Sequence, residues 1–264
     1  MQLGLEGKTA LVTGSTAGIG YAAALGLARE GALVVVNGRT AARVDEAISK
    51  IKQEAGSEKV SGVAADLGTA DGCAAAIMQV PKVDILVNNL GIFEPKEFGD
   101  ITDADWMRFF ETNVLSGVRL SRHYFPLMKA QNWGRIVFVS SESAVNIPKE
   151  MIHYGMTKTA QLAVARGLAE MTVGTNVTVN SVLPGPTKSE GVGTFIAQMA
   201  QGQGIDESKA EEMFFESVRP SSLIHRFAST DEVAAMITFV CSEAASAVNG
   251  AALRVEGGVV RSVV

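Results

Sequence analysis

The sequence predicts an α/β protein whose doubly wound parallel sheet of about seven strands has helices on both faces, giving a three-layer sandwich. The first observation is the order of elements. Short apolar stretches alternate with longer helical stretches along almost the whole chain, and such alternation implies parallel strands joined by right-handed crossovers. The second is the apolar pattern within the strands, which is continuous rather than alternating and so typical of strands buried on both faces.

Each expected strand is a short run rich in aliphatic and β-branched residues. In chain order the runs are KTALVT (8–13), ALVVV (32–36), KVSGVAA (59–65), VDILVNN (83–89), GRIVFVSS (134–141), NVTVNSVLP (176–184) and AALRV (251–255). The helices expected after the first six runs lie at about 18–30, 41–55, 70–79, 103–131, 152–172 and 230–244.

One connection is longer than a sheet of this kind needs. Residues 188–222 separate the sixth strand from the last helix, and long segments of this kind in compact domains are often lids over a binding site. We therefore expect a single domain over residues 1–264, with a substrate lid at about 188–222.

Charge and composition exclude several classes of function. The net charge is −5 and no basic cluster is present, which argues against nucleic-acid binding through phosphate neutralisation. The longest aliphatic runs, such as ALVVV, are too short to span a bilayer. The N-terminal stretch MQLGLEGKTALV lacks the basic region and long apolar core of a signal peptide. We expect a cytoplasmic protein that binds neither nucleic acid nor membrane.

The cysteines and histidines predict no metal centre. Cys73 and Cys241 lie far apart in the sequence, and two buried reduced thiols are the favoured interpretation, although a disulfide is the open alternative. The histidines, His123, His153 and His225, show no spacing typical of metal ligands.

The stretch TGSTAGIG (13–20) leaves the first expected strand and enters the first helix. Glycines at such a turn let a dinucleotide pyrophosphate approach the backbone, and the helix N-terminus offers free N–H groups and a positive dipole. The spacing of Gly14, Gly18 and Gly20 differs from the usual G-x-G-x-x-G. Taken alone, the stretch is also explained by a tight strand–helix turn with close packing.

Three further motifs follow other expected strands. They are NNLG (88–91), the serine pair at 140–141 with YGMTK (154–158) after it, and LPG (183–185). The carboxyl ends of parallel strands share one edge of the sheet, where ligands bind in open α/β folds. Packing alone does not explain four motifs at one edge, so we expect a ligand site there.

Tyr154 and Lys158 are four residues apart and share one face of a helix. A lysine ammonium near a phenol favours the phenolate and lowers the tyrosine pKa, which suits acid–base chemistry near neutral pH. The hydroxyl of Ser141, thirteen residues upstream, would polarise a carbonyl oxygen by donating to it. An isolated Y-x-x-x-K is more often an exposed helix pair, but the glycine turn and Ser141 together favour a reaction site.

These motifs together resemble the short-chain dehydrogenase/reductase family, whose Rossmann fold matches the expected sheet. The resemblance runs from about Leu5 to Gly258. TGSTAGIG is similar to the family's T-G-x-x-x-G-x-G cofactor turn, and NNLG to its N-N-A-G, with Leu90 in place of alanine. The leucine leaves the local packing open to question but not the chemistry.

The resemblance implies four catalytic residues. Tyr154 would exchange a proton with the carbonyl or alcohol oxygen, and Ser141 would orient and polarise that carbonyl. Lys158 would lower the tyrosine pKa and hold the nicotinamide ribose. Asn113, in ETNV, would fix a water that links Lys158 to bulk solvent. The spacing favours Ser141 over Ser140 as the catalytic serine.

The resemblance also implies cofactor contacts from the glycine turn, the ends of the second and third strands, and the loops at the edge. These residues are Gly14, Ser15, Thr16, Gly18, Ile19, Gly20, Arg39, Asp66, Leu67, Asn89, Gly91, Tyr154, Lys158, Pro184, Gly185 and Thr187.

The end of the second strand, VVVNGRT, favours NADP(H) over NAD(H). Enzymes that prefer NAD usually place an acidic residue there to bind the ribose 2′-hydroxyl. Here the matching residue is Gly38, and Arg39 follows with a guanidinium suited to a 2′-phosphate. Ser15 and Thr16 are expected as neutral partners, and Ala17 stands where many NADP-binding relatives carry a basic residue.

The predicted function is therefore NADP(H)-dependent hydride transfer between a nicotinamide and a small carbonyl or secondary alcohol of unknown identity. Alternatives are a 3-oxoacyl carrier-protein reductase, a non-catalytic dinucleotide sensor, or a nucleotide-sugar epimerase, although the last resembles a different glycine spacing. Glu142, His153 and Phe93 are open candidates for the substrate cleft. The apolar content of 47% and the helix pairing of similar proteins predict a homotetramer, or failing that a dimer.

Overall fold

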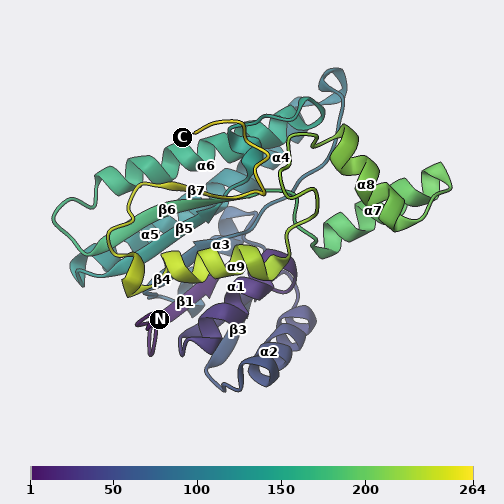
Figure 1. The fold of residues 1–264 in the computed structure, drawn as a ribbon. Helices are drawn as coiled ribbons and strands as arrows, with labels where there is room; N and C mark the ends of the chain where they lie inside the picture. Colours follow the sequence, from purple (N-terminus) through teal and green to yellow (C-terminus); the bar gives the residue numbers. More distant parts are fainter. Residues whose placement is uncertain (1, 264) are drawn as a thin grey trace.

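A seven-stranded parallel sheet forms the centre of the protein, in the order β3-β2-β1-β4-β5-β6-β7 (Figure 1). The computed structural model describes residues 2–263, and of Phe195 only the main chain. The strands are β1 (Thr9–Val12), β2 (Leu33–Gly38), β3 (Val60–Ala64), β4 (Ile85–Asn88), β5 (Gly134–Val139), β6 (Val177–Pro184) and β7 (Ala252–Val255). The doubly wound sheet predicted from the sequence is confirmed.

Helices cover both faces of this sheet. They are α1 (Gly18–Arg29), α2 (Ala41–Ala55), α3 (Ala70–Gln79), α4 (Asp103–Phe110), α5 (Ser116–Ala130), α6 (Ile152–Glu170), α7 (Glu190–Gln203), α8 (Glu207–Ser217) and α9 (Thr230–Val240). One core lies between the sheet and α1, α2 and α9, and the other lies between the sheet and α3, α5 and α6. Together the two cores make the three layers.

Strand residues alternate between these two cores, which explains the continuous apolar runs in the sequence. In β1, Ala10 and Val12 face the first core while Leu11 faces the second. In β5, Val137 and Ile136 show the same alternation. A strand buried on both faces has no solvent side on which a polar residue would be favoured.

The long helix expected at 103–131 is interrupted. It consists of α4, a π-helical turn η2 (Glu111–Leu115) and α5. The turn has Asn113 at its centre, and the Gln161 side chain donates to the Asn113 main-chain carbonyl over 2.6 Å. A single wide turn of this kind is common at functional sites, and apolar periodicity does not reveal it.

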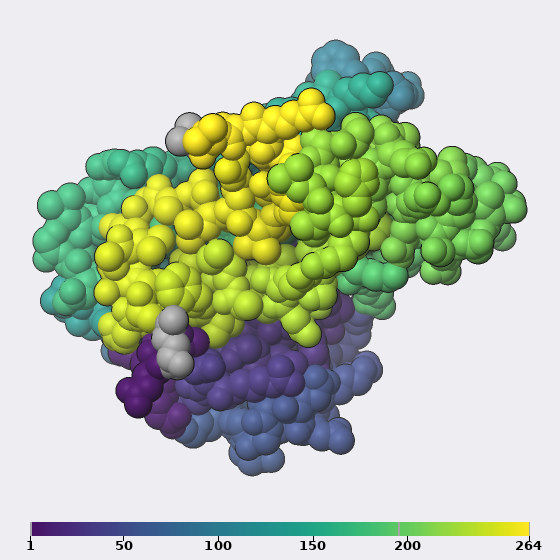
Figure 2. Space-filling view, viewed as in Figure 1, coloured from purple at the N-terminus to yellow at the C-terminus, as the bar shows by residue number. Residues whose placement is uncertain are grey.

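The segment at 188–222 folds mainly as α7 and α8, which project beyond the end of the sheet (Figures 1 and 2). Ile196, Ala200, Ala210 and Phe215 of these helices form a small apolar cluster with Phe227, which precedes α9. We refer to residues 188–222 as the lid segment, and its lid role remains a prediction. A separate cluster means that the segment packs largely on itself rather than on the two main cores.

Candidate active site

A cleft of about 570 Å³ lies at the carboxyl ends of the central strands, beside the lid segment. Nine of the residues expected at the site line it. They are Ile19, Asn89, Gly91, Ser141, Tyr154, Lys158, Pro184, Gly185 and Thr187. The other expected residues lie along the β1–α1 turn, at the ends of β2 and β3, and in the π-helical turn. The strand order therefore brings distant motifs to one edge, as the sequence predicted.

The β1–α1 turn has the shape that a pyrophosphate requires. Gly14 and Gly18 have φ angles of +58° and +60°, which side-chain-bearing residues rarely adopt. A Cβ atom on Gly20 would lie 2.4 Å from the Gly14 carbonyl oxygen. The N-cap of α1, Ala17, makes no side-chain capping bond, so the first N–H groups of the helix are available to an anion.

The side chain of Asn37, in β2, holds the main chain of the β1–α1 turn in place by hydrogen bonds. Its side-chain oxygen accepts from the Gly14 amide over 3.0 Å, and its side-chain nitrogen donates to the carbonyls of Val63 and Ala65. One buried amide side chain thus joins the turn to β3. An unpaired polar group left here would be costly, so the position demands a residue with both a donor and an acceptor.

The expectation that Ser15 offers a neutral hydrogen-bond partner to the cofactor phosphate is wrong. Ser15 is fully buried. Its hydroxyl donates to the Val12 carbonyl over 2.6 Å and accepts from the Asn37 amide, while its own amide donates to the Asn37 carbonyl. The side chain of Leu67 is also used inside the protein, because it is buried in the second core. Only the Leu67 main chain is therefore available to a cofactor. Thr16 stays half-buried at the turn.

The NNLG loop is tied to the glycine turn by Thr13. The Thr13 hydroxyl accepts from the amides of Asn89 and Leu90, both at 2.9 Å. The Asn89 side chain donates in turn to the carbonyls of Thr13 and Gly14. Leu90, which replaces the alanine of the family motif, packs against the second core, so the leucine is accommodated without disturbing these bonds.

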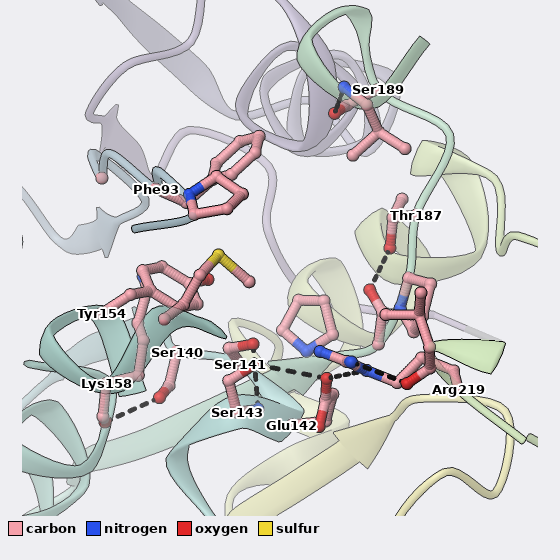
Figure 3. Close-up of a pocket in the computed structure, with 18 of the residues that line it drawn as sticks. Phe93, Ser140, Ser141, Glu142, Ser143, Tyr154, Lys158, Thr187, Ser189 and Arg219 are labelled. Carbon is pink, nitrogen blue, oxygen red and sulfur yellow. Dashed lines mark hydrogen bonds and ion pairs between the residues drawn. The ribbon is translucent and has the colours of Figure 1, made fainter. Parts of the chain in front are cut away.

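Ser141, Tyr154 and Lys158 meet in the cleft (Figure 3). The Lys158 ammonium is buried and lies 5.6 Å from the centroid of the Tyr154 ring. Among residues 2–263 it has one hydrogen-bond acceptor, the Val139 carbonyl at 3.1 Å. An ammonium has three donors, so two remain for ribose hydroxyls. This surplus fits a nicotinamide nucleotide.

The two adjacent serines have different partners. The Ser140 hydroxyl donates to the Lys158 carbonyl over 2.9 Å. Ser141 lies close enough to Tyr154 to lower the pKa of its phenol, and the Ser141 hydroxyl accepts from the Ser143 amide over 3.1 Å. The geometry therefore supports the choice of Ser141 as the serine beside the reacting oxygen.

Burial dominates the protonation of the pair. It raises the pKa of Tyr154 to about 12, against the effect of the Ser141 hydrogen bond. It also lowers the pKa of Lys158 to about 8. In the protein alone the pKa of Tyr154 is thus raised and not lowered as expected, because the loss of solvent around the phenol outweighs the Ser141 and Arg219 effects that lower it.

Asn113 does not line the cleft, and its side chain is committed to the protein. The amide oxygen accepts from the Ile92 amide over 2.8 Å, and the amide nitrogen donates to the Ile92 carbonyl and the Thr157 hydroxyl. These bonds tie the loop after β4 to α6. The water-mediated link from Asn113 to Lys158 stays a prediction.

The three open candidates differ in position. Glu142 is buried and lines the cleft, and Phe93 lines it with its ring edge-on to Tyr154 at 6.4 Å. His153 is fully buried outside the cleft lining, and its ring centroid lies 4.1 Å from that of Phe109 with the two planes tilted by 59°. Sequence reasoning missed Arg219, which lines the cleft and pairs with Glu142 (Figure 3), since no local pattern distinguishes this arginine from others.

The end of β2 leaves no space for an acidic side chain. A Cβ atom on Gly38 would lie 2.5 Å from the Thr16 methyl and 3.1 Å from Val44. Arg39 is exposed and has no ion-pair partner within residues 2–263. Arg43, also missed from the sequence, forms an exposed ion pair with Glu190 of the lid segment at 3.3 Å. The end of β2 and the start of α2 therefore carry the positive charges of Arg39 and Arg43, and position 38 has no carboxylate.

The described residues contain neither a metal-binding cluster nor a membrane-spanning helix. Over residues 2–263 no group of three or more histidine, cysteine, aspartate or glutamate side chains is placed to hold a metal ion. Across the same residues, no helix combines the length and the apolar character needed to cross a membrane.

Replacing Lys158 by Met should stabilise the protein at neutral pH. The lowered pKa means that the folded protein binds the Lys158 proton less tightly than the unfolded chain does, so the charged form destabilises the fold below pH 8. Between pH 8 and about 10, wild type should regain about 1.4 kcal/mol per pH unit relative to Lys158→Met. Denaturant unfolding at several pH values measures the difference.

The exposed Lys82 provides the matched control as Lys82→Met. If the stability difference between wild type and Lys158→Met stays constant from pH 7 to 10, the buried ammonium does not carry the cost assigned to it.

Known proteins are similar to this chain in sequence and in fold. The short chain dehydrogenase family profile matches residues 8–200. The chain is 50% identical over 263 residues to the uncharacterized oxidoreductase YvaG of Bacillus subtilis, with 100% of both chains covered. It is 31% identical to the 3-oxoacyl-acyl-carrier-protein reductase FabG of Aquifex aeolicus, covering 98% of this chain and 99% of that protein.

Among solved structures, L-sorbose reductase from Gluconobacter frateurii, complexed with NADPH and L-sorbose, superposes with a TM-score of 0.93. Its sequence identity is 33%, and 100% of each chain is covered. The fold, the residues gathered at the sheet edge and these matches agree. The chain belongs to the short-chain dehydrogenase/reductase family and is an oxidoreductase.

Proposed function

We propose that the protein transfers a hydride between NADP(H) and a small carbonyl compound or secondary alcohol. The observation that carries this proposal is the meeting of Ser141, Tyr154 and Lys158 in one cleft beside the glycine turn. A dinucleotide sensor without catalysis would need none of these three side chains together.

The roles of the side chains follow from their positions. The bound nicotinamide supplies or accepts the hydride. With a pKa raised to about 12, Tyr154 is a protonated phenol at neutral pH and suits the acid role in carbonyl reduction. Ser141 holds the reacting oxygen by a hydrogen bond, and the two free donors of Lys158 bind the ribose.

Two classes of carbonyl compound are candidate substrates. The resemblance to FabG of Aquifex aeolicus supports 3-oxoacyl thioesters as one candidate, and the likeness to L-sorbose reductase supports ketoses as another. A panel of ketones, ketoses and an acetoacetyl thioester, followed by the absorbance of reduced nicotinamide, separates these candidates. A well-folded protein that binds NADPH and turns over none of them would contradict the proposal.

Tyr154→Phe should reduce turnover at least about 100-fold, the usual scale of general acid–base catalysis. NADPH affinity should stay near wild type, because the phenol is assigned to proton transfer and Lys158 to the ribose. Steady-state rates and a fluorescence titration with NADPH measure the two effects. Near-normal turnover in a folded variant would remove Tyr154 from the acid–base role.

We propose NADP(H) as the preferred cofactor, with NAD(H) second. The support is the missing carboxylate at Gly38, the exposed and unpaired Arg39, and the NADPH bound by the sorbose reductase relative. A carboxylate at Gly38 would repel the 2′-phosphate, whereas a guanidinium binds it with two parallel hydrogen bonds.

Arg39→Ala should raise the Michaelis constant for NADPH roughly tenfold or more, as expected for losing a charged hydrogen bond of about 1.5–3 kcal/mol. The constant for NADH should change little, because NADH has no 2′-phosphate. Parallel kinetics with both cofactors test the difference. An equal effect on both, or a wild-type preference for NADH, would contradict the assignment.

A cytoplasmic homotetramer is proposed as the working state. Cys73 and Cys241 are both free and buried, as expected of a reducing compartment. Large apolar side chains are exposed on the subunit, among them Val173 at 84% and Leu223 at 82%, and association would cover such surfaces. Light scattering at micromolar concentration should give four times the subunit mass, and a stable monomer would contradict this.

A further inference from the structure

Glu142 places a buried negative charge directly after Ser141. Only 3% of its surface is exposed. Its Oε1 atom accepts from the Ser143 hydroxyl at 3.2 Å, and its Oε2 atom has a long contact of 3.4 Å with the Asn146 side chain. A carboxylate taken out of water requires a compensating charge, and these neutral neighbours provide none.

The compensating charge comes from the lid segment. The Arg219 Nε atom donates to Glu142 Oε1 over 2.9 Å, and its Nη1 atom reaches Glu150 at 3.4 Å. Arg219 follows the end of α8 and is itself buried. Glu150 belongs to the 3-10 turn that leads into α6, the helix of Tyr154. One guanidinium therefore joins the lid segment to the two turns that lie between Ser141 and Tyr154 in the sequence.

This pair lines the same cleft as the phenol, with Ser141 between them in the view of Figure 3. The Glu142 charge raises the pKa of Tyr154 and the Arg219 charge lowers it. The other charged residues that line the cleft are Lys158, on the same helix as Tyr154, and Lys149 and Glu150. With both members in place, the Glu142 and Arg219 charges act on the phenol in opposite directions.

We propose that Arg219 is a positioning residue of the reaction, which latches the lid segment over Ser141 and neutralises the Glu142 charge beside Tyr154. The proposal rests on the proposed oxidoreductase chemistry. If the lid segment moves away, Glu142 is left unpaired in a buried site, so the closed arrangement is favoured. The Glu142 charge near the phenol is then balanced by Arg219 only when the lid segment is closed.

The test compares Arg219→Met, Glu142→Gln and the double variant by the pH dependence of alcohol oxidation with NADP⁺. The midpoint is the pH at which the oxidation rate reaches half of its maximum. Arg219→Met should raise this midpoint by about one pH unit, because an unpaired carboxylate disfavours the phenolate. Glu142→Gln, which keeps the size and the acceptor for Arg219, should move the midpoint downward. The double variant removes both charges and should return the midpoint close to wild type.

Hydrogen exchange of the lid segment provides a readout independent of activity. Amides of α7 and α8 should exchange about tenfold faster in Arg219→Met, since the latch is lost. Arg226→Met is the matched control, because Arg226 forms an exposed ion pair with Glu232 outside the cleft lining. It should change neither the exchange of α7 and α8 nor the midpoint.

The outcomes separate the two proposals. Midpoints that do not move, or that move in the same direction in both single variants, would overturn the charge-balancing role even if the rates fall. Unchanged exchange in Arg219→Met would overturn the latch. If wild type turns over no carbonyl compound, the proposed function fails, and the exchange experiment still decides whether Arg219 holds the lid segment. Should Arg219→Met not fold, the downward shift in Glu142→Gln remains the deciding result.

Discussion

All seven strands point the same way, and the site depends on this constraint. Parallel strands need crossover helices on both faces, so the loops at the carboxyl edge follow strands that pack between two helical layers. Thr13, Asn37 and Asn89 then cross-link these loops with hydrogen bonds between main chain and side chain. The loops where the cofactor is expected are therefore tied to each other as well as to the sheet.

Much of the architecture could be predicted from the sequence. The bounds of α2 and α3 match the expected ranges, because apolar periodicity and strand alternation are local signals. The residues at the sheet edge were also found, since each motif directly follows a strand. The π-helical turn around Asn113 could not be foreseen, because it depends on a contact with Gln161 on another helix.

Long-range contacts explain the remaining differences. Ser15 was expected at the cofactor because of its place in the motif, but its hydroxyl is used inside the protein by Val12 and Asn37. Arg219 was not expected at all, because its partner Glu142 lies 77 residues away. Similarly, the raised pKa of Tyr154 follows from burial in the assembled cleft. The four-residue spacing between Tyr154 and Lys158 carries no information about that burial. Sequence reasoning located the chemical groups but not their partners.

The separate apolar cluster of α7 and α8 has an evolutionary consequence. Its members, Ile196, Ala200, Ala210, Phe215 and Phe227, stabilise these helices without drawing on the two cores that flank the sheet. Substitutions on the cleft side of this unit can therefore accumulate without lowering the stability of the nucleotide-binding framework. New substrate preferences can arise in such a lineage while the hydride-transfer chemistry is inherited unchanged.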